Sequence, residues 1–294
     1  AHVLLECGCH CIAELSERHP DYDLRIKSTM GGGGKGQRII KRGSSQNQWR
    51  ESIEAVWQEV KAGASTLAKN IVVELNLPLI RHWEIQLVGN GQWCVSLGGR
   101  DCSVQRHEQK LIEWSLRQDQ LPEHEALLLA GLEQAAKRFG EAIGLDSVST
   151  YEAIIPVQTP ATGQATDQLS TTQTAFFMEM NTRLQVEHIV SELTHHLVFE
   201  CPRFDTTISA DTSSSYLVSE QQPDQLRVTQ LIHLMCLLAL YKHELPKPQV
   251  VLAKPWAIEL RLNCLNQALR PAPGGLLQTW SPPTGQELRF DQGL

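Results

Sequence analysis

The segment that most constrains the fold is residues 176–188, which read FFMEMNTRLQVEH. It starts with three apolar residues, and the polar residues that follow alternate with apolar ones. Since successive side chains of a β-strand point to opposite faces, the alternation predicts a strand with one polar face. We expect Phe176, Phe177 and Met178 to be buried, and the strand to deliver the carboxylate of Glu179 into a cleft.

The spacing within this segment favours a metal site. Glu179, Asn181 and Arg183 are two residues apart, so on a strand they share a face. Glu152 lies in another strand-like run, TYEAII, which can pair beside them. Carboxylates and an amide oxygen on neighbouring strands suit Mg²⁺, which proteins commonly hold through one or two carboxylates plus substrate phosphates. The alternative is a pair of solvated glutamates on an edge strand.

A glycine-rich stretch, STMGGGGKGQR, follows the strand-like run LRIK. The glycines Gly31 to Gly34 and Gly36 free the backbone to approach a ligand and to point N–H groups at phosphate oxygens. Lys27, at the end of the preceding run, adds a cation close to them. The stretch is neither a G-x-x-x-x-G-K-[ST] nor a G-x-G-x-x-G motif, and a flexible linker is the alternative. Together with the strand carboxylates, it predicts a site for ATP with magnesium.

Hydrophobic periodicity along the chain predicts strands that alternate with helices, with several hairpin-like pairs, which is typical of an α/β or α+β enzyme. Two polar stretches, 158–174 and 204–225, are expected to be insertions. The expected helices are 3–19, 47–68, 123–143 and 231–241, and the tail VEHIVSELTHHLV should enter a further helix. The expected strands are 24–27, 39–40, 71–75, 82–89, 150–157 and 256–265, and 93–110 should hold a strand and a polar turn.

Composition excludes several classes of function. The 294 residues carry a formal net charge of -7, which argues against general nucleic-acid binding because that relies on a basic footprint. No apolar run reaches the ~18–20 residues that cross a bilayer, and the N-terminus AHVLLECGCHC lacks the pattern of a secretory signal. Eight scattered cysteines are typical of a reduced, cytoplasmic protein. The C-x-C-x-C spacing at residues 7–11 is not the usual metal-ligand spacing, so an ordinary apolar segment is favoured there.

Several stretches in the same order resemble the biotin carboxylase component of biotin-dependent carboxylases, a branch of the ATP-grasp family. They are GGGGKGQR, HWEIQ, GGRDCSVQRHEQK, FFMEMNTRLQVEH, AIELRLN, PAPGG and LRFDQG. The resemblance implies an α+β fold of the ATP-grasp type, with a small glycine-rich lid subdomain and the beginning of the biotin carboxylase C-terminal domain. It implies ATP, Mg²⁺ (or Mn²⁺) and biotin as cofactors, and carboxylation of biotin with bicarbonate through carboxyphosphate.

The resemblance also assigns roles to individual residues. Glu187 would be the general base for bicarbonate, Arg289 would stabilise negative charge on the biotin ureido oxygen, and Lys110 and Arg183 would act in catalysis. The bicarbonate site would consist of Lys110, Arg183, Gln185 and Val186. The magnesium ligands would be Glu152, Glu179 and Asn181. The ATP site would consist of Lys27, Gly31, Gly32, Gly33, Gly34, Gly36, Glu74, His82 and Gln105.

The resemblance implies three parts of the chain: a lid subdomain at 1–75, a catalytic subdomain at 76–254 and the start of the C-terminal domain at 255–294. The family has a complete domain before the lid and a longer C-terminal domain, so we expect a chain truncated at both ends. The implied partners are a biotin carboxyl carrier protein or domain and a carboxyltransferase component, with a homodimer left open and no nucleic acid or membrane. Two alternatives remain: a carboxyphosphate-forming ligase of the carbamoyl-phosphate synthetase type, and a non-catalytic ATP-binding remnant.

Overall fold

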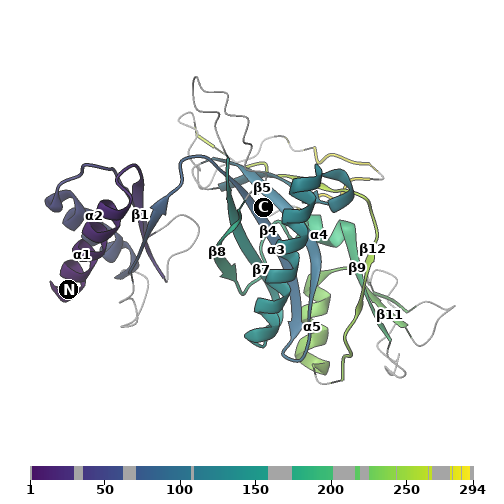
Figure 1. Ribbon diagram of the computed structural model, residues 1–294. Coiled ribbons are helices and arrows are strands. Elements are labelled where there is room, and N and C mark those ends of the chain that lie inside the picture. Colours follow the sequence, from purple (N-terminus) through teal and green to yellow (C-terminus); the bar gives the residue numbers. More distant parts are fainter. Residues whose placement is uncertain are drawn as a thin grey trace. The chain divides into compact units, whose positions relative to one another are not determined.

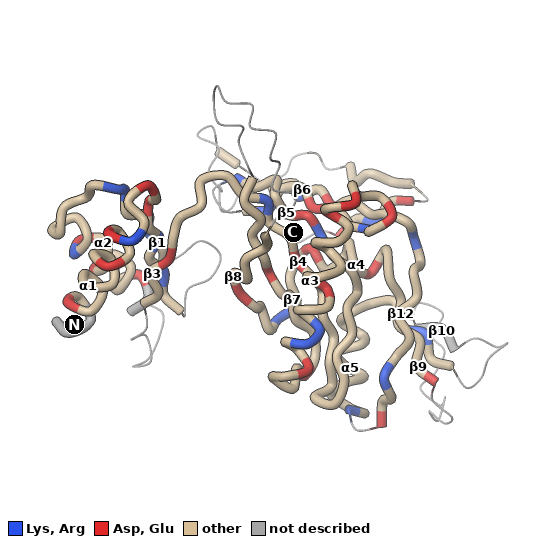
Figure 2. Tube along the Cα trace, in the orientation of Figure 1, with Lys and Arg blue, Asp and Glu red and all other residues tan. Residues whose placement is uncertain are grey.

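The computed structural model of the chain divides it into two units, Ala1–Leu260 and Arg261–Leu294. The residues that the structure describes are 2–29, 36–61, 71–106, 109–157, 174–200, 216–218, 225–242, 244–263, 265–266, 279, 281–285 and 287–291. The predicted division at 75 and 254 stays a prediction. Lysine and arginine positions are interspersed with aspartate and glutamate positions along the trace (Figure 2). None of the described helices is both long and apolar enough to cross a membrane.

The N-terminal part of the larger unit is a three-stranded antiparallel sheet of order β2-β1-β3, packed against two helices. Helix α2 starts with a reciprocal cap: Ser45 N donates to Gln48 Oε1 at 2.8 Å, and Gln48 N donates to Ser45 Oγ at 3.4 Å. Ile12, Ile26 and Ile53 lie in the buried core between this sheet and the two helices. The elements are α1 (His2–Arg18), β1 (Asp23–Ser28), β2 (Gln37–Ile40), α2 (Gln46–Lys61) and β3 (Ile71–Asn76).

The second sheet has six antiparallel strands in the order β13-β6-β5-β4-β7-β8, of which Figure 1 labels β4, β5, β7 and β8. Helix α3 packs against β4 and β5, where Trp83, Ile85 and Leu129 form a buried core. Every strand pair of the described sheets is antiparallel, which confirms the predicted α+β class. The elements are β4 (Ile80–Asn90), β5 (Cys94–Arg106), β6 (Gln109–Leu116), a 3₁₀ turn (Gln118–Gln120), α3 (Glu123–Ala142), β7 (Asp146–Pro156), β8 (Phe176–Asn181), α4 (His188–Thr194) and β13 (Ile258–Leu260).

A four-stranded sheet of order β10-β11-β9-β12 and helix α5 complete this unit. Leu231, Leu234 and Leu238 of α5 pack in a core with Val88 of β4 and Phe199 of β9, so the predicted buried helix is confirmed. The elements are β9 (His195–Glu200), β10 (Tyr216–Val218), β11 (Gln225–Val228), α5 (Leu231–Tyr241) and β12 (Gln249–Leu252).

Three predictions about local structure need correction. Phe176 and Phe177 are 48% and 50% exposed rather than buried, because β8 is an edge strand of its sheet. The Phe177 ring instead lies 4.8 Å from the Tyr151 ring on the neighbouring strand. The predicted strand at 256–265 is shortened to β13, and strand β10 lies inside the predicted insertion at 204–225. Most of that insertion, and residues 158–173, lie outside the described residues.

Two glycines of α3 predict opposite effects of the same substitution. A Cβ at Gly140 would lie 2.6 Å from Cys94 Sγ, whereas a Cβ at Gly131 would meet nothing within 4 Å. Gly131→Ala is therefore expected to stabilise the protein by about 0.5–1 kcal/mol, since alanine loses less backbone entropy in a helix. Gly140→Ala is expected to destabilise it by about 1–3 kcal/mol through overpacking. Urea unfolding of the two variants checks this, and equal effects of both substitutions would contradict the packing of α3.

Candidate active site

A row of charged side chains crosses four neighbouring strands of the six-stranded sheet. Arg100 of β5 lies opposite Glu84 of β4, Glu84 lies opposite Glu152 of β7, and Glu152 lies opposite Glu179 of β8. We call these four residues the charged row. Residues in register on antiparallel strands share a face, so the row brings four ionisable groups onto one side of the sheet. The register of Glu152 with Glu179 confirms the predicted pairing of these strands.

Lys110 of β6 and Glu187 complete the charge cluster. The Lys110 ammonium contacts Glu84 Oε1 and Glu187 Oε1, and it lies 3.8 Å from Glu152 Oε1. Glu187 directly precedes α4 and is 3% exposed, while Glu84 is fully buried. Three carboxylates therefore surround one ammonium group inside the protein. A buried arrangement of this kind is stable only when further hydrogen bonds satisfy the charges.

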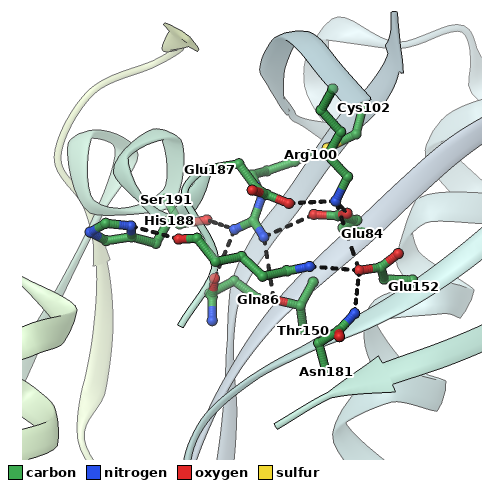
Figure 3. Close-up of polar contacts among 12 residues, drawn as sticks. Glu84, Gln86, Arg100, Cys102, Thr150, Glu152, Asn181, Glu187, His188 and Ser191 are labelled. Carbon is green, nitrogen blue, oxygen red and sulfur yellow. Dashed lines mark hydrogen bonds and ion pairs between the residues drawn. The ribbon is translucent and has the colours of Figure 1, made fainter. Parts of the chain in front are cut away.

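Arg100 supplies the second positive charge, and its side chain is fully buried. Figure 3 shows its guanidinium group between β4 and α4. Nη2 lies 3.0 Å from Glu84 Oε2 and 3.4 Å from Thr150 Oγ1. Nη1 donates to Gln86 Oε1 at 2.8 Å and to Ser191 Oγ at 2.9 Å. The planar fork of arginine is suited to such fixed, divergent hydrogen bonds.

Glu152 is held by polar side chains on three sides. Its Oε1 accepts from Asn181 Nδ2 at 2.6 Å and from Gln185 Nε2 at 2.7 Å. Its Oε2 lies 2.8 Å from His82 Nε2. Gln105 Nε2 lies 2.8 Å from His82 Nδ1 and donates to the carbonyl oxygen of Cys102 at 2.7 Å. Glu152 is therefore held as an ionised acceptor.

The two carboxylates nearest to Lys110 have low pKa values. Burial alone would raise the pKa of Glu152, but contact with His82 and the charge of Lys110 outweigh it and lower the pKa to about 2. Burial likewise opposes ionisation of Glu187, and the charges of Lys110 and Arg100 lower its pKa to about 2. Both groups are therefore ionised at neutral pH.

Glu152, Glu179 and Asn181 fit a hard cation. The Asn181 amide nitrogen donates to Glu152 Oε1 at 2.6 Å and to Glu179 Oε1 at 3.1 Å, so the three side chains converge on one point. Turning the amide over would present Oδ1 at that point, which gives an all-oxygen set suited to Mg²⁺. A second group, His82, Glu84 and Glu152, also has its ligand atoms within 4.8 Å of one another. It is a poorer cation site, because Lys110 and Arg100 already neutralise Glu84.

Two of the predicted ATP residues lie next to each other in the three-stranded sheet. Lys27 Nζ lies 2.9 Å from Glu74 Oε2 across β1 and β3. Gly36 donates its backbone N–H to Glu59 Oε2 at 2.9 Å. Residues Gly31 to Gly34 lie outside the described residues. His82 and Gln105 contact each other beside the charged row, in the six-stranded sheet.

The remaining three predicted residues are two exposed residues that follow β8 and one residue of the second unit. Arg183 is exposed and donates to the carbonyl oxygen of Leu184 at 3.3 Å. Val186 is 59% exposed. Arg289 belongs to the second unit, where its guanidinium lies 3.0 Å from Asp291 Oδ2. Their predicted roles concern ligands and stay predictions.

Sequence reasoning missed four members of the cluster: Glu84, Gln86, Arg100 and Ser191. Charged residues inside strands are usually exposed, so HWEIQ and GGRD carried no sign of burial. The available signal was the alternation of His82, Glu84 and Gln86, which places all three on one face of β4.

Comparisons with known proteins agree with this arrangement. The sequence pattern of the family described as "Carbamoyl-phosphate synthase L chain, ATP binding domain" matches residues 13–197. The chain is 38% identical over 173 residues to the mitochondrial methylcrotonoyl-CoA carboxylase subunit alpha of Dictyostelium discoideum, covering 58% of this chain and 22% of that protein. It is 30% identical over 276 residues to a biotin carboxylase of Nostoc sp., covering 92% of this chain and 48% of that protein.

The fold has a close counterpart among solved structures. The crystal structure of a biotin carboxylase–beta-gamma-ATP complex from Campylobacter jejuni superposes with a TM-score of 0.65 and 24% identity, covering 95% of this chain and 50% of that one. This confirms the expected biotin carboxylase type of ATP-grasp fold. The chain spans at most about half the length of the relatives compared here, from 22% to 48% for the two curated proteins.

Proposed function

This chain belongs to the family of the carbamoyl-phosphate synthase L chain ATP-binding domain, and from that premise we propose that its site uses ATP to carboxylate biotin with bicarbonate. The likeness to biotin carboxylases and to carboxylase alpha subunits supports this choice within the family. The observation that carries the proposal is the contact of Lys110 with Glu187, beside the converging side chains of Glu152, Glu179 and Asn181. A cation, a base and a group of metal ligands in one place are suited to the activation of a small anion by ATP.

In the proposed first step, bicarbonate binds to Lys110 with help from Arg183, Gln185 and Val186. The Glu187 carboxylate takes the proton of bicarbonate, and the bicarbonate oxygen forms a bond to the γ-phosphorus of ATP. The bond from that phosphorus to the β–γ bridging oxygen breaks, and ADP leaves with carboxyphosphate as the product. When bicarbonate draws Lys110 away from Glu187, the pKa of Glu187 rises, so the base becomes stronger at the moment of proton transfer.

ATP would be held by Lys27, Glu74, His82 and Gln105 with the backbone of Gly31 to Gly34 and Gly36. The Glu74 carboxylate forms an ion pair with Lys27, and an ATP phosphate would take the place of that carboxylate. Magnesium would be held by Glu152, Glu179 and Asn181 and would neutralise charge on the transferred phosphoryl group. Arg289 would stabilise the biotin ureido oxygen. A biotin carboxyl carrier and a carboxyltransferase component would be the partners.

The decisive test is ATP hydrolysis by the chain, measured with and without bicarbonate, biotin and EDTA. We expect turnover that requires bicarbonate, rises with free biotin and disappears when EDTA removes magnesium. Turnover that rises with ammonia instead of biotin would favour chemistry of the carbamoyl-phosphate synthetase type. ATP binding without bicarbonate-dependent turnover would contradict the proposed activity for this chain and would identify an ATP-binding remnant.

A further inference from the structure

We propose that Arg100 is a positioning residue that fixes Glu187 and Lys110 for proton transfer by joining the sheet to helix α4. The inference that Arg100 affects catalysis rests on the proposed function. The structural part of the proposal depends only on two contacts of Arg100: an ion pair with Glu84 of β4 and a hydrogen bond to Ser191 of α4.

The first branch of the connection runs through Glu84. Arg100 Nη2 lies 3.0 Å from Glu84 Oε2, and the other oxygen of Glu84 contacts the Lys110 ammonium. Since Glu84 is fully buried, its orientation is set by these two partners. Arg100 therefore determines where Glu84 holds Lys110.

The second branch runs through Ser191. Arg100 Nη1 donates to Ser191 Oγ at 2.9 Å, and Ser191 lies one helical turn after Glu187. Ser191 is 1% exposed, so water does not compete for this hydrogen bond. Helix α4 has only seven residues and begins directly after Glu187. The contact of Ser191 with Arg100, one turn along, therefore fixes the position of Glu187 in the cluster.

The two branches meet at the contact between Lys110 and Glu187. Losing either branch lets α4 or Glu84 move, and Lys110 then loses its fixed place between the two carboxylates. The charged groups that the structure describes near Glu187 include Lys110 of β6, Arg100 of β5, Glu84 of β4 and Glu152 of β7, with the Cys102 thiol also within electrostatic reach. Among these, only Lys110 and Arg100 favour the ionised base.

The experiment uses three variants of the full chain: Arg100→Lys keeps the charge but removes the fork, Ser191→Ala removes the α4 branch alone, and the third combines both. Arg81→Lys is the matched control. Arg81 also pairs with two carboxylates, at 2.9 Å to Asp101 and 2.7 Å to Glu125, but its side chain lies on the other face of β4. Circular dichroism and thermal unfolding establish that each variant is folded.

The first readout does not need turnover. In protein labelled with ¹³C at the glutamate carboxyl carbons, the Glu187 resonance is assigned by its loss in Glu187→Gln, and its pKa is measured by pH titration. We expect Arg100→Lys and Ser191→Ala to raise the Glu187 pKa by about one unit, a tenfold change in its proton affinity, as contact with Lys110 is lost. Arg81→Lys should leave it unchanged. An unaltered Glu187 pKa in a folded Ser191→Ala protein would overturn the proposal, even if Arg100→Lys does not fold.

The second readout is the rate. We expect Arg100→Lys and Ser191→Ala each to lower kcat for bicarbonate-dependent ATP hydrolysis by about 10-fold, with the KM for ATP unchanged, because a small displacement of a catalytic group has effects of this size or larger. The double variant should be no slower than Arg100→Lys, since both changes break one connection. Fully additive losses would contradict the connection. If the unaltered chain has no such turnover, the proposed function fails while the titration still decides the role of Arg100.

Discussion

Replacing Glu187 by glutamine is expected to lower kcat for bicarbonate-dependent ATP hydrolysis by about 10²–10⁴-fold, the usual contribution of a positioned general base. Glutamine has nearly the same shape, and its amide oxygen can still accept from Lys110, so the fold and the binding of ATP should be retained. Only the ability to take a proton is lost. The measurement is the steady-state rate with bicarbonate varied, together with calorimetric titration of ATP.

Glu192→Gln is the matched control for this result. Glu192 is also a buried glutamate and lies within α4, but its carboxylate accepts from the backbone N–H of Leu231 at 2.6 Å, at the start of α5. A glutamine oxygen can accept the same hydrogen bond, so kcat should stay at the level of the unaltered chain. Equal losses in both variants would mean that the helix, and not the base, is being disturbed. Full activity of Glu187→Gln would exclude Glu187 as the base.

Replacing Lys110 by methionine is expected to lower kcat/KM for bicarbonate by about 10²–10³-fold, because it removes the one ammonium group of the cluster. The side chain is 12% exposed, and methionine fills a similar volume, so the packing is largely kept. Unlike Glu187→Gln, this change should raise the KM for bicarbonate as well as lower kcat. Rates at a series of bicarbonate concentrations separate the two effects.

Lys110→Met should also change how stability depends on pH. In the unaltered chain, the pKa values of Glu152 and Glu187 are lowered to about 2, so their stabilisation is present above the ordinary glutamate pKa of about 4.3 and is lost as the pH falls towards 2. Without Lys110, the main cause that lowers the pKa of Glu187 is lost, while burial and Arg100 remain, so this pKa should rise. The stabilisation that Glu187 gives above about pH 4.3 should therefore shrink.

Urea unfolding at a series of pH values measures this weaker dependence of stability on pH. Lys242→Met serves as the control, since Lys242 forms an ion pair with Asp146 at 2.6 Å but is 34% exposed and belongs to no part of the site. The stability of Lys242→Met should have the same pH dependence as that of the unaltered chain. A Lys110→Met variant with that same pH dependence would show that Lys110 does not hold the two carboxylates in their ionised form.

The metal-binding face of the candidate site was predictable because strands have a strict period of two. Glu179 and Asn181 share a face from their spacing alone, and TYEAII offered a neighbouring strand for Glu152. The place of Lys110 beside Glu187 could not be predicted from spacing, because the two residues are 77 positions apart in the chain. The resemblance to a family grouped them by role, and the fold explains how they meet.

The burial of Phe176 and Phe177 was mispredicted for a physical reason. An apolar run shows that a strand carries apolar side chains, but it does not show whether a neighbouring strand or helix covers them. Here the run forms an edge strand, and both rings remain half exposed although the Phe177 ring contacts Tyr151 and Phe139. Arg100 was missed because a charged residue in a strand is normally exposed, whereas this one is fully buried and its charge is paired with Glu84.

The charged row has a consequence for the order in which the protein is built. Arg100 and Glu84 come from one hairpin and can pair as soon as β5 leaves the ribosome, but Glu152 and Glu179 are synthesised later. The hydrogen bond from Arg100 to Ser191 spans 91 positions of the chain. Long-range contacts form slowly because loop closure must precede them. The nascent chain therefore carries the groups of an active site well before it has one, and catalytic competence should appear among the last events of folding.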